Sequence, residues 1–323
     1  MVLVEKGWFL RSLRITHPFL RKLRFSLPHP QRSASFLPRL AATLALGLSL
    51  ATSAVAQDAE DRLAETIHRV EDRLDARTGV MVRDTGSDWT WAYRAEERFL
   101  MNSTVKPVIC GAVLAEVDGG ALTLDEVLPI RDENLLSYAP VTETRVGESM
   151  SIGDLCLATL DMSDNTAANL LMDRLGGPQE VTAFLRDIGD PVTRLDRREP
   201  ELNTFAPGDP RDTTTPAAML DTLQAMLLGD ALTPASRAQL AEWMSRGGVT
   251  GALLRAEAPA DWEIADKSGG GDQTRNIVAM VTPRDHAPWL VAIYLSDADV
   301  DFVTRNAALQ EIGAAVMAVL KSR

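Results

Sequence analysis

The spacing of hydrophobic residues predicts both helices and strands along this chain. Leu63, Ile67, Val70 and Leu74 recur at intervals of three and four, which predicts an amphipathic helix over residues 61–76. Similar patterns predict helices over 105–116, 152–162, 166–175, 179–188, 216–228, 234–246 and 301–320. Short apolar or alternating runs predict strands over 78–83, 89–94, 264–267, 275–281 and 289–295.

The order of these elements predicts how the chain is divided. A helix and two strands come first, a long helical stretch follows, and three strands and a helix close the chain. We expect residues 57–94 and 246–323 to form one α/β lobe that shares a sheet, and residues 95–245 to form a helical lobe. A cleft between two such lobes is a natural ligand site.

One stretch, residues 197–212, fits neither kind of element. It is rich in Pro, Glu, Asp and Gly, with the length and composition of a compact omega loop, called the ω-loop below. Arg197 and Asp212 at its two ends could pair and close it. Glu199 and Asn203, four residues apart, could hold one water and direct it at a bound ester. A solvated charged loop is the alternative.

The first 56 residues have the pattern of a secretion signal. Residues 1–39 contain eight basic residues and one acid, residues 40–56 contain no charge, and the run ends Ala54-Val55-Ala56. Signal cleavage is therefore expected near Ala56/Gln57. A membrane anchor is disfavoured, because the uncharged run is shorter than the roughly 20 apolar residues that span a bilayer.

Charge and histidine content exclude several kinds of function. The whole chain has a formal net charge of −12, and the segment after residue 56 carries −19 because the leader is basic. Nucleic acid and anionic membrane surfaces are therefore not expected as partners after the leader is removed. His68 and His286 are the only histidines beyond the leader, so neither a metal site nor a cofactor is expected. The G-x-S-x-G pattern of Ser-His-Asp hydrolases is absent.

Two cysteines, Cys110 and Cys156, leave two possibilities open. An exported protein could join them in one disulfide, or they could be two buried free thiols. The residue types alone do not decide between these states.

Three lysines occur beyond the leader, and two of them belong to patterns that could carry chemistry. Ser103 and Lys106 lie three apart near the start of a predicted apolar helix, so they share a helical face where Lys106 could activate the Ser103 hydroxyl. A serine near a helix start with a solvated lysine is the alternative, but a lysine without a role is costly on so apolar a helix. Lys267 precedes Ser268, Gly269, Gly270 and Gly271, a segment that could hold a carboxylate or be a flexible hairpin.

A further polar cluster, Ser163-Asp164-Asn165, lies between two predicted helices. Taken alone, it is best explained as an ordinary helix N-cap. Its position relative to the other motifs changes that interpretation.

In this order and spacing, the motifs resemble those of the class A β-lactamases: S-x-x-K, S-D-N, E-x-x-L-N and K-[ST]-G. The similarity extends over 103–114, 138–141, 195–203, 212–218 and 265–269. The resemblance implies an α/β fold of the β-lactamase/transpeptidase type, in which an antiparallel sheet is flanked by helices in three layers and an all-α lobe is inserted.

The resemblance also implies roles in catalysis. Ser103 is the expected nucleophile, and the amides of Ser103 and Gly270 are the expected oxyanion hole. Lys106 assists acylation directly, or Glu199 does so through a water. Ser163 passes a proton to the leaving nitrogen beside Lys267, and Glu199 with Asn203 directs the deacylating water.

Substrate contacts follow from the same resemblance. Lys267, Ser268 and Arg275 are expected to receive the substrate carboxylate beside Gly269, Asn165 to bind the side-chain amide, and Tyr138 to line the entrance. The resemblance further implies a cis Glu199–Pro200 bond and favours the disulfide between Cys110 and Cys156. Two departures stand out: Asn102 is unusual before the nucleophile, and segment 271–275 is about one residue short.

The expected function is hydrolysis of penicillins and some cephalosporins by a monomer in the periplasm, which confers antibiotic resistance. A penicillin-binding DD-peptidase shares three of the motifs but lacks a base for deacylation, so Glu199 and Asn203 argue against it. Serine glutaminases and esterases do not fit the ω-loop pattern. A non-catalytic penicillin sensor usually belongs to a membrane-spanning transducer.

Overall fold

The computed structural model describes residues 37–323, with side chains from residue 55 onward. The chain divides after Leu48 into two units, and the unit from Ser49 to Arg323 contains the sheets and the predicted site residues. Helix α1 (Leu37–Leu74) runs through the predicted cleavage point at Ala56/Gln57, while residues 1–36 of the predicted leader lie outside the described part. Among the helices described, none has the length and apolar content needed to cross a bilayer.

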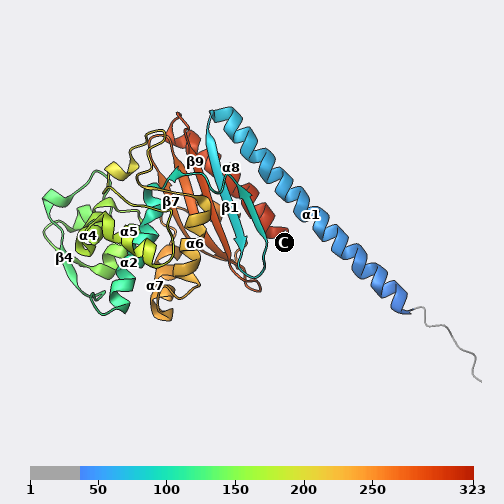
Figure 1. Cartoon of the computed structure of the whole chain (residues 1–323), viewed down its shortest axis with the longest axis horizontal. Helices are drawn as coiled ribbons and strands as arrows, with labels where there is room; N and C mark the ends of the chain where they lie inside the picture. The colour runs from blue at the N-terminus through green and yellow to red at the C-terminus, as the bar shows by residue number, and fades with distance from the viewer. Residues whose placement is uncertain (1–36) are drawn as a thin grey trace, which may run out of the picture. The chain divides into compact units, whose positions relative to one another are not determined.

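A five-stranded antiparallel sheet forms the centre of this unit (Figure 1). Its strands are β1 (Arg77–Asp84), β2 (Thr90–Tyr93), β7 (Glu263–Gly270), β8 (Arg275–Thr282) and β9 (Trp289–Ser296), in the order β2-β1-β9-β8-β7. Strand β9 is buried at every position and pairs with β1, so the first and last parts of the chain share one sheet, as predicted.

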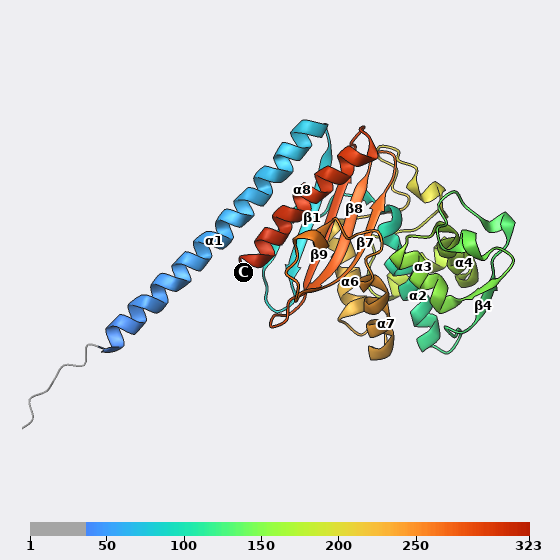
Figure 2. The same cartoon turned by 180° about the vertical axis from the view of Figure 1, so that it is seen from behind.

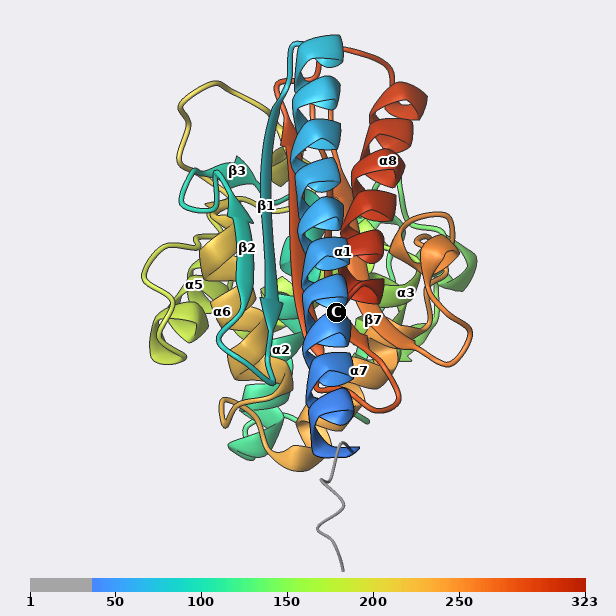
Figure 3. The same ribbon diagram turned by 90° about the vertical axis from the view of Figure 1, so that its right-hand side faces the viewer.

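Two helices cover one face of this sheet. The part of α1 that begins at Ser49 and helix α8 (Phe302–Lys321) lie side by side on it (Figures 2 and 3). Leu63 and Ile67 of α1 and Ile312 of α8 are fully buried in one apolar cluster with the sheet. The three-and-four spacing of apolar residues in the sequence is the stripe that this face buries.

The opposite face of the sheet joins the helical part of the chain. Helices α6 (Pro216–Leu227) and α7 (Pro234–Ser245) contact the sheet, and α2 (Lys106–Asp118), α3 (Ile152–Asp161), α4 (Asn165–Leu175) and α5 (Pro178–Asp187) pack beyond them. Every residue of α2 from Lys106 to Leu114 is buried, which explains why its sequence is apolar on all sides. The result is the three-layer α/β fold with a helical lobe that the sequence indicated.

Several short elements had no signal in the hydrophobic pattern. Strand β3 (Phe99–Leu100) pairs with β6 (Thr213–Thr214), and β4 (Val127–Pro129) pairs with β5 (Ser149–Ser151). Five 3₁₀ turns complete the fold: η1 (Asn102–Val105), η2 (Asp132–Asn134), η3 (Thr142–Arg145), η4 (Glu201–Asn203) and η5 (Leu254–Glu257). Two- and three-residue elements are too short to show a period, and long-range pairing decides them.

Most predicted ends lie within two residues of the observed ones. The larger differences are the start of α1, at Leu37 where residue 61 was predicted, and the end of β7. Residue 105 ends the 3₁₀ turn η1, so helix α2 begins at Lys106 and not before it. Strand β7 continues to Gly270, three residues beyond the predicted end, because Gly269 and Gly270 stay paired with Asn276 and Arg275 of β8. The glycines are therefore part of the sheet and not of a hairpin after it.

We expect Gly79→Ala to destabilise the fold by roughly 1–3 kcal/mol, the usual cost of overpacking a core. An added Cβ at Gly79 would lie 2.3 Å from Cε2 of buried Phe99. Gly251→Ala is the matched control, since no atom lies within 4 Å of its added Cβ. Urea unfolding of both variants measures the difference, and equal midpoints would contradict the packing argument.

Candidate active site

The motifs predicted from the sequence meet around one cavity of about 550 Å³. Nine of the predicted site residues line it: Ser103, Tyr138, Ser163, Asn165, Asn203, Ser268, Gly269, Gly270 and Arg275. Lys106, Glu199 and Lys267 lie beneath this surface and are almost fully buried. Polar groups from the helical lobe, the ω-loop and β7 thus converge on one hollow.

Ser103 is held in η1, directly against strand β7. A Cβ added at Gly269 would lie 3.0 Å from the backbone nitrogen of Ser103 and 2.8 Å from the Met101 carbonyl oxygen. Only glycine allows so close an approach of two backbones. The Gly269-Gly270 backbone is therefore brought beside the Ser103 amide.

Two buried lysines reach the Ser163 hydroxyl from different elements. Lys106 Nζ donates to the Ser163 carbonyl oxygen at 2.8 Å, to Asn165 Oδ1 at 2.6 Å and to Ser163 Oγ at 3.3 Å. Lys267 Nζ donates to the same Oγ at 3.0 Å. With two ammonium groups donating to it, Ser163 Oγ keeps its own proton free to donate elsewhere.

Burial changes the proton affinity of both amines. Loss of water lowers the pKa of Lys106, although the neighbouring Glu199 carboxylate acts in the opposite direction. The pKa of Lys267 lies well below its ordinary value, first because of burial and then because Lys106 and Arg275 are also positive. Each amine therefore gives up its proton more readily than an exposed lysine does.

The ω-loop is fastened at its two ends. Arg197 Nε contacts Asp212 Oδ2 at 2.5 Å, and the backbone amides of Asp196 and Arg197 donate to Asp212 Oδ1 at 2.7 and 2.9 Å. Asp212 is fully buried and has a left-handed φ of 56°. The loop that the composition indicated is thus closed by the two residues that could pair at its ends.

Glu199 points from this loop into the interior, where it is 2% exposed. Its Oε2 accepts from Asn203 Nδ2 at 2.5 Å, and its Oε1 lies 3.2 Å from Lys106 Nζ. Within residues 55–323, no donor makes a hydrogen bond of good geometry to Oε1. The Glu199–Pro200 bond is cis, as predicted.

Asn169 is a site residue that the sequence did not reveal. Its side-chain amide donates to the Glu199 carbonyl oxygen at 2.8 Å and accepts from the Glu199 amide at 3.0 Å. It lies one helical turn after Asn165 on α4, so the two side chains project from the same face of that helix. This spacing was the sign of Asn169 that the sequence offered. Asn169 therefore fixes the backbone from which the Glu199 carboxylate projects.

The other end of the cavity is positively charged. Arg275 is buried, donates to the Gly269 carbonyl oxygen at 2.9 Å and to Asn306 Oδ1 at 3.0 Å, and lies over the Phe302 ring. Burial, with Arg305 nearby, lowers its pKa to about 10. The short segment after Gly270 thus still brings Arg275 to the cavity, where exposed Tyr138 also lies.

The two cysteines lie next to each other as free thiols. Cys110 and Cys156 are both fully buried, and Cys110 Sγ lies 3.8 Å from the Cys156 carbonyl oxygen. Burial and the hydrogen-bonding Cys110 side chain raise the pKa of the Cys156 thiol well above its ordinary value. The favoured disulfide is therefore not what the structure contains: two buried free thiols pack there instead.

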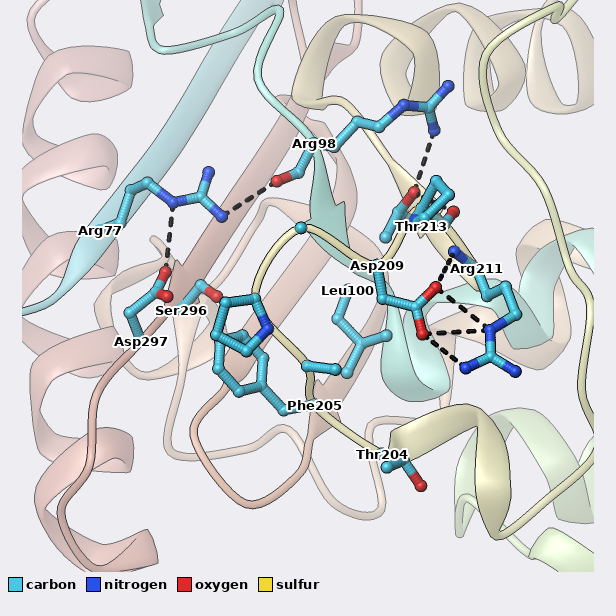
Figure 4. A pocket seen from close by; sticks show the side chains of 14 residues that line it. Arg77, Arg98, Leu100, Thr204, Phe205, Asp209, Arg211, Thr213, Ser296 and Asp297 are labelled. Atoms are coloured by element: carbon cyan, nitrogen blue, oxygen red, sulfur yellow. Dashed lines mark hydrogen bonds and ion pairs between the residues drawn. The ribbon is translucent and has the colours of Figure 1, made fainter.

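A second hollow, of about 380 Å³, lies behind the ω-loop and holds none of the predicted catalytic residues (Figure 4). Its arginines are occupied by protein groups: Arg77 contacts Asp297 and the Arg98 carbonyl oxygen, Arg98 donates to Thr213 Oγ1, and Arg211 pairs with Asp209. Within residues 55–323, no group of three or more His, Cys, Asp or Glu side chains is arranged to hold a metal ion.

Comparison with known proteins gives matches over nearly the whole described unit. The model of the β-lactamase enzyme family matches residues 62–320. A β-lactamase of Rhodobacter capsulatus is 55% identical over 289 residues, covering 90% of this chain and 99% of the relative. The β-lactamase AER-1 of Aeromonas hydrophila is 46% identical over 254 residues, which are 78% of this chain and 84% of that protein.

Solved structures agree with these sequence matches. The class A β-lactamase of the last common ancestor of Gram-negative bacteria is 50% identical, with a TM-score of 0.77 over 81% of this chain and 99% of that one. A β-lactamase from Xanthomonas campestris is 47% identical, with a TM-score of 0.78 over 81% and 98% of the two chains.

We expect Arg197→Ala to loosen the ω-loop, because it removes the cation from the fully buried Asp212 carboxylate. Breaking one side of a buried pair costs on the order of 3–5 kcal/mol, reduced here because two backbone amides remain on Asp212. Hydrogen exchange of residues 197–212 and urea unfolding measure the effect. Arg211→Ala, which removes an exposed arginine paired with Asp209 on the same loop, is the control and should change neither.

Proposed function

This chain belongs to the β-lactamase enzyme family as a class A serine β-lactamase, and on that basis we propose how its own residues hydrolyse the β-lactam ring. Ser103 forms an ester with the opened ring, and a water activated by Glu199 releases it. The observation that carries this proposal is the Glu199 carboxylate. It is buried, its Oε2 is held by Asn203, and its Oε1 makes no hydrogen bond with residues 55–323.

Acylation begins when Ser103 Oγ attacks the carbonyl carbon of the ring. Lys106 has acceptors for all three ammonium hydrogens, which favours its charged form and leaves Glu199, acting through a water, to take the Ser103 proton. The alternative is a direct role for Lys106: its pKa is lowered, and Glu199 lies 3.2 Å away to receive a proton from it. The negative oxygen that develops is stabilised by the amides of Ser103 and Gly270.

Ring opening then breaks the bond from the carbonyl carbon to the ring nitrogen. The electron pair of that bond goes to the nitrogen, which needs a proton. Ser163 supplies it, because its Oγ accepts from both Lys106 and Lys267 and keeps its own hydrogen for donation. The two lysines stabilise the transient negative charge on that oxygen until the proton that Glu199 took from Ser103 passes through Lys106 to Ser163 Oγ. This transfer leaves Glu199 ionised for deacylation.

Deacylation uses the same carboxylate. Glu199 Oε1 removes a proton from the water, the resulting hydroxide attacks the ester carbon, and the proton returns to Ser103 Oγ as the ester bond breaks. Asn203 holds the second oxygen of Glu199, so the carboxylate stays turned toward the ester. This second step separates a hydrolase from a DD-peptidase, which would remain acylated.

Substrate recognition follows from the charge of the cavity. A penicillin or cephalosporin carries a carboxylate beside the ring. Ser268 and Arg275 in the cavity wall, with Lys267 buried beneath it, receive this group next to Gly269. Asn165 binds the amide of the substrate side chain, and Tyr138 borders the entrance. We propose that the enzyme acts as a monomer in the periplasm after cleavage near Ala56/Gln57, and that it confers resistance to these antibiotics.

We expect Glu199→Ala to become trapped after one turnover, because the ester forms but its base is missing. Mass spectrometry should find the mass of the opened penicillin on Ser103, while the unchanged enzyme turns over a chromogenic cephalosporin many times. Glu201→Ala, an exposed acid on the same loop, is the control and should turn over normally. A single stoichiometric burst from the unchanged enzyme would favour the DD-peptidase instead.

The alkaline limb of kcat/KM should report the protonation of Lys267. The charged amine binds the substrate carboxylate, so kcat/KM falls as pH rises through the lowered pKa, below the ordinary lysine value of 10.5. In Lys267→Arg the limb should move to higher pH, since a guanidinium keeps its proton there. Lys321→Arg, at the far end of α8, is the control. An unmoved limb in Lys267→Arg would assign the titration to another group.

A further inference from the structure

Asn102, the residue before the nucleophile, is a polar side chain in a fully buried position. It has a left-handed φ of 50°, a conformation that asparagine tolerates better than most residues. Its Oδ1 accepts from Thr274 Oγ1 at 2.7 Å and from Asn276 Nδ2 at 3.0 Å. Its Nδ2 donates to Asn203 Oδ1 at 3.0 Å. Asn102 therefore connects strand β8 and the preceding turn to the ω-loop.

These contacts form a series of amides in which each donor fixes the orientation of the next. The series starts at the sheet, where the backbone amide of Leu295 donates to Asn276 Oδ1 at 3.3 Å and leaves Asn276 Nδ2 to donate to Asn102 Oδ1. Asn102 must then turn its Nδ2 toward Asn203 Oδ1. Asn203 in turn directs its Nδ2 at Glu199 Oε2, 2.5 Å away, and at the Pro200 carbonyl oxygen, 3.2 Å away.

We propose that Asn102 is a positioning residue for deacylation: it holds the Asn203 amide in the orientation that donates to Glu199. The inference rests on the proposed function, because it assigns Asn102 to the step that Glu199 performs. A reversed Asn203 amide would set its oxygen against the Glu199 carboxylate and the Pro200 carbonyl oxygen, where neither could donate. Glu199 would then lose the group that holds Oε2 and keeps Oε1 directed at the water.

The neighbouring glycine gives independent support. A Cβ added at Gly271 would lie 2.7 Å from Asn102 Nδ2 and 3.1 Å from the Asn203 carbonyl oxygen. The turn after β7 therefore leaves room for this amide pair only because residue 271 has no side chain. Gly271→Ala should push the Asn102 amide away from Asn203 without changing any group in the series.

The sharpest test is Asn102→Asp, which replaces one NH₂ group by an oxygen of similar size. Aspartate can still accept from Thr274 and Asn276, and it tolerates a left-handed φ, but it cannot donate to Asn203 Oδ1. We expect deacylation to slow by about tenfold or more, as for the loss of a charge-assisted contact, while acylation changes by less than about threefold. Because only the later step slows, kcat and KM should fall together, and acyl-enzyme should accumulate during turnover of a penicillin.

Thr274→Val is the matched control. It removes one donor from Asn102 Oδ1 but leaves Asn276 in place and does not touch Asn203. If Asn102 and its hydrogen-bond partners had only a structural role, both variants would lose stability. Neither variant would then change the ratio of the deacylation rate to the acylation rate. We expect Thr274→Val to deacylate within about twofold of the unchanged enzyme at the same loss of stability. Equal slowing of deacylation in both variants would overturn the proposal.

A double-mutant cycle with Asn203→Ala supplies the decisive readout. If Asn102 acts through Asn203, Asn102→Asp should not slow deacylation further once Asn203 is replaced; additive effects would overturn the inference. Should Asn102→Asp fail to fold, Gly271→Ala is expected to show the same selective loss of deacylation. Glu199→Ala separates a failure of the proposed function from a failure of this inference. If Glu199→Ala gives no trapped adduct, the proposed function fails. If it gives a trapped adduct but Asn102→Asp deacylates normally, only the role of Asn102 is rejected.

Discussion

The site depends on one buried pair of opposite charges, Lys106 and Glu199. Their side chains are fully buried and lie 3.2 Å apart, so neither charge can be left without the other at reasonable cost. Lys106 comes from the start of helix α2, and Glu199 comes from the ω-loop. Each element must therefore be held in place before the pair can form. The remaining contacts of the site act largely to meet that requirement.

Three sets of contacts hold the ω-loop, and they come from different parts of the fold. The Arg197–Asp212 pair closes its ends, and the Asn169 side chain binds the backbone of Glu199 from helix α4. The third is the series of amides that runs from the sheet to the Glu199 carboxylate. A loop with little apolar surface cannot be fixed by packing alone, so hydrogen bonds to buried partners take its place. The carboxylate is consequently oriented by a rigid sheet as well as by its own loop.

The local charge of the cavity is opposite to that of the molecule. The chain as a whole carries −12, yet Lys106, Lys267 and Arg275 gather around Ser163 and the Gly269 segment. Burial lowers the pKa values of all three groups, and repulsion by Lys106 and Arg275 lowers that of Lys267 further, which shows what it costs to bring these charges together. A substrate carboxylate would relieve part of that cost. In the function proposed above, recognition of an anion by an acidic protein is therefore a property of the cavity and not of the surface.

The sequence by itself determined the enzyme family and most of the architecture. Hydrophobic spacing located the long helices and the sheet strands, and four polar motifs identified Ser103, Lys106, Ser163, Glu199 and Lys267, because such residue types in that order are rare by chance. Only the tertiary structure decided the extension of β7 through its glycines, the short strand pairs, the free state of Cys110 and Cys156, and the contacts of Asn169 and Asn102. These features depend on contacts between segments far apart in the chain. Asn169 binds a backbone thirty residues away, and its only local sign is a spacing of one helical turn from Asn165, which ordinary helices also show.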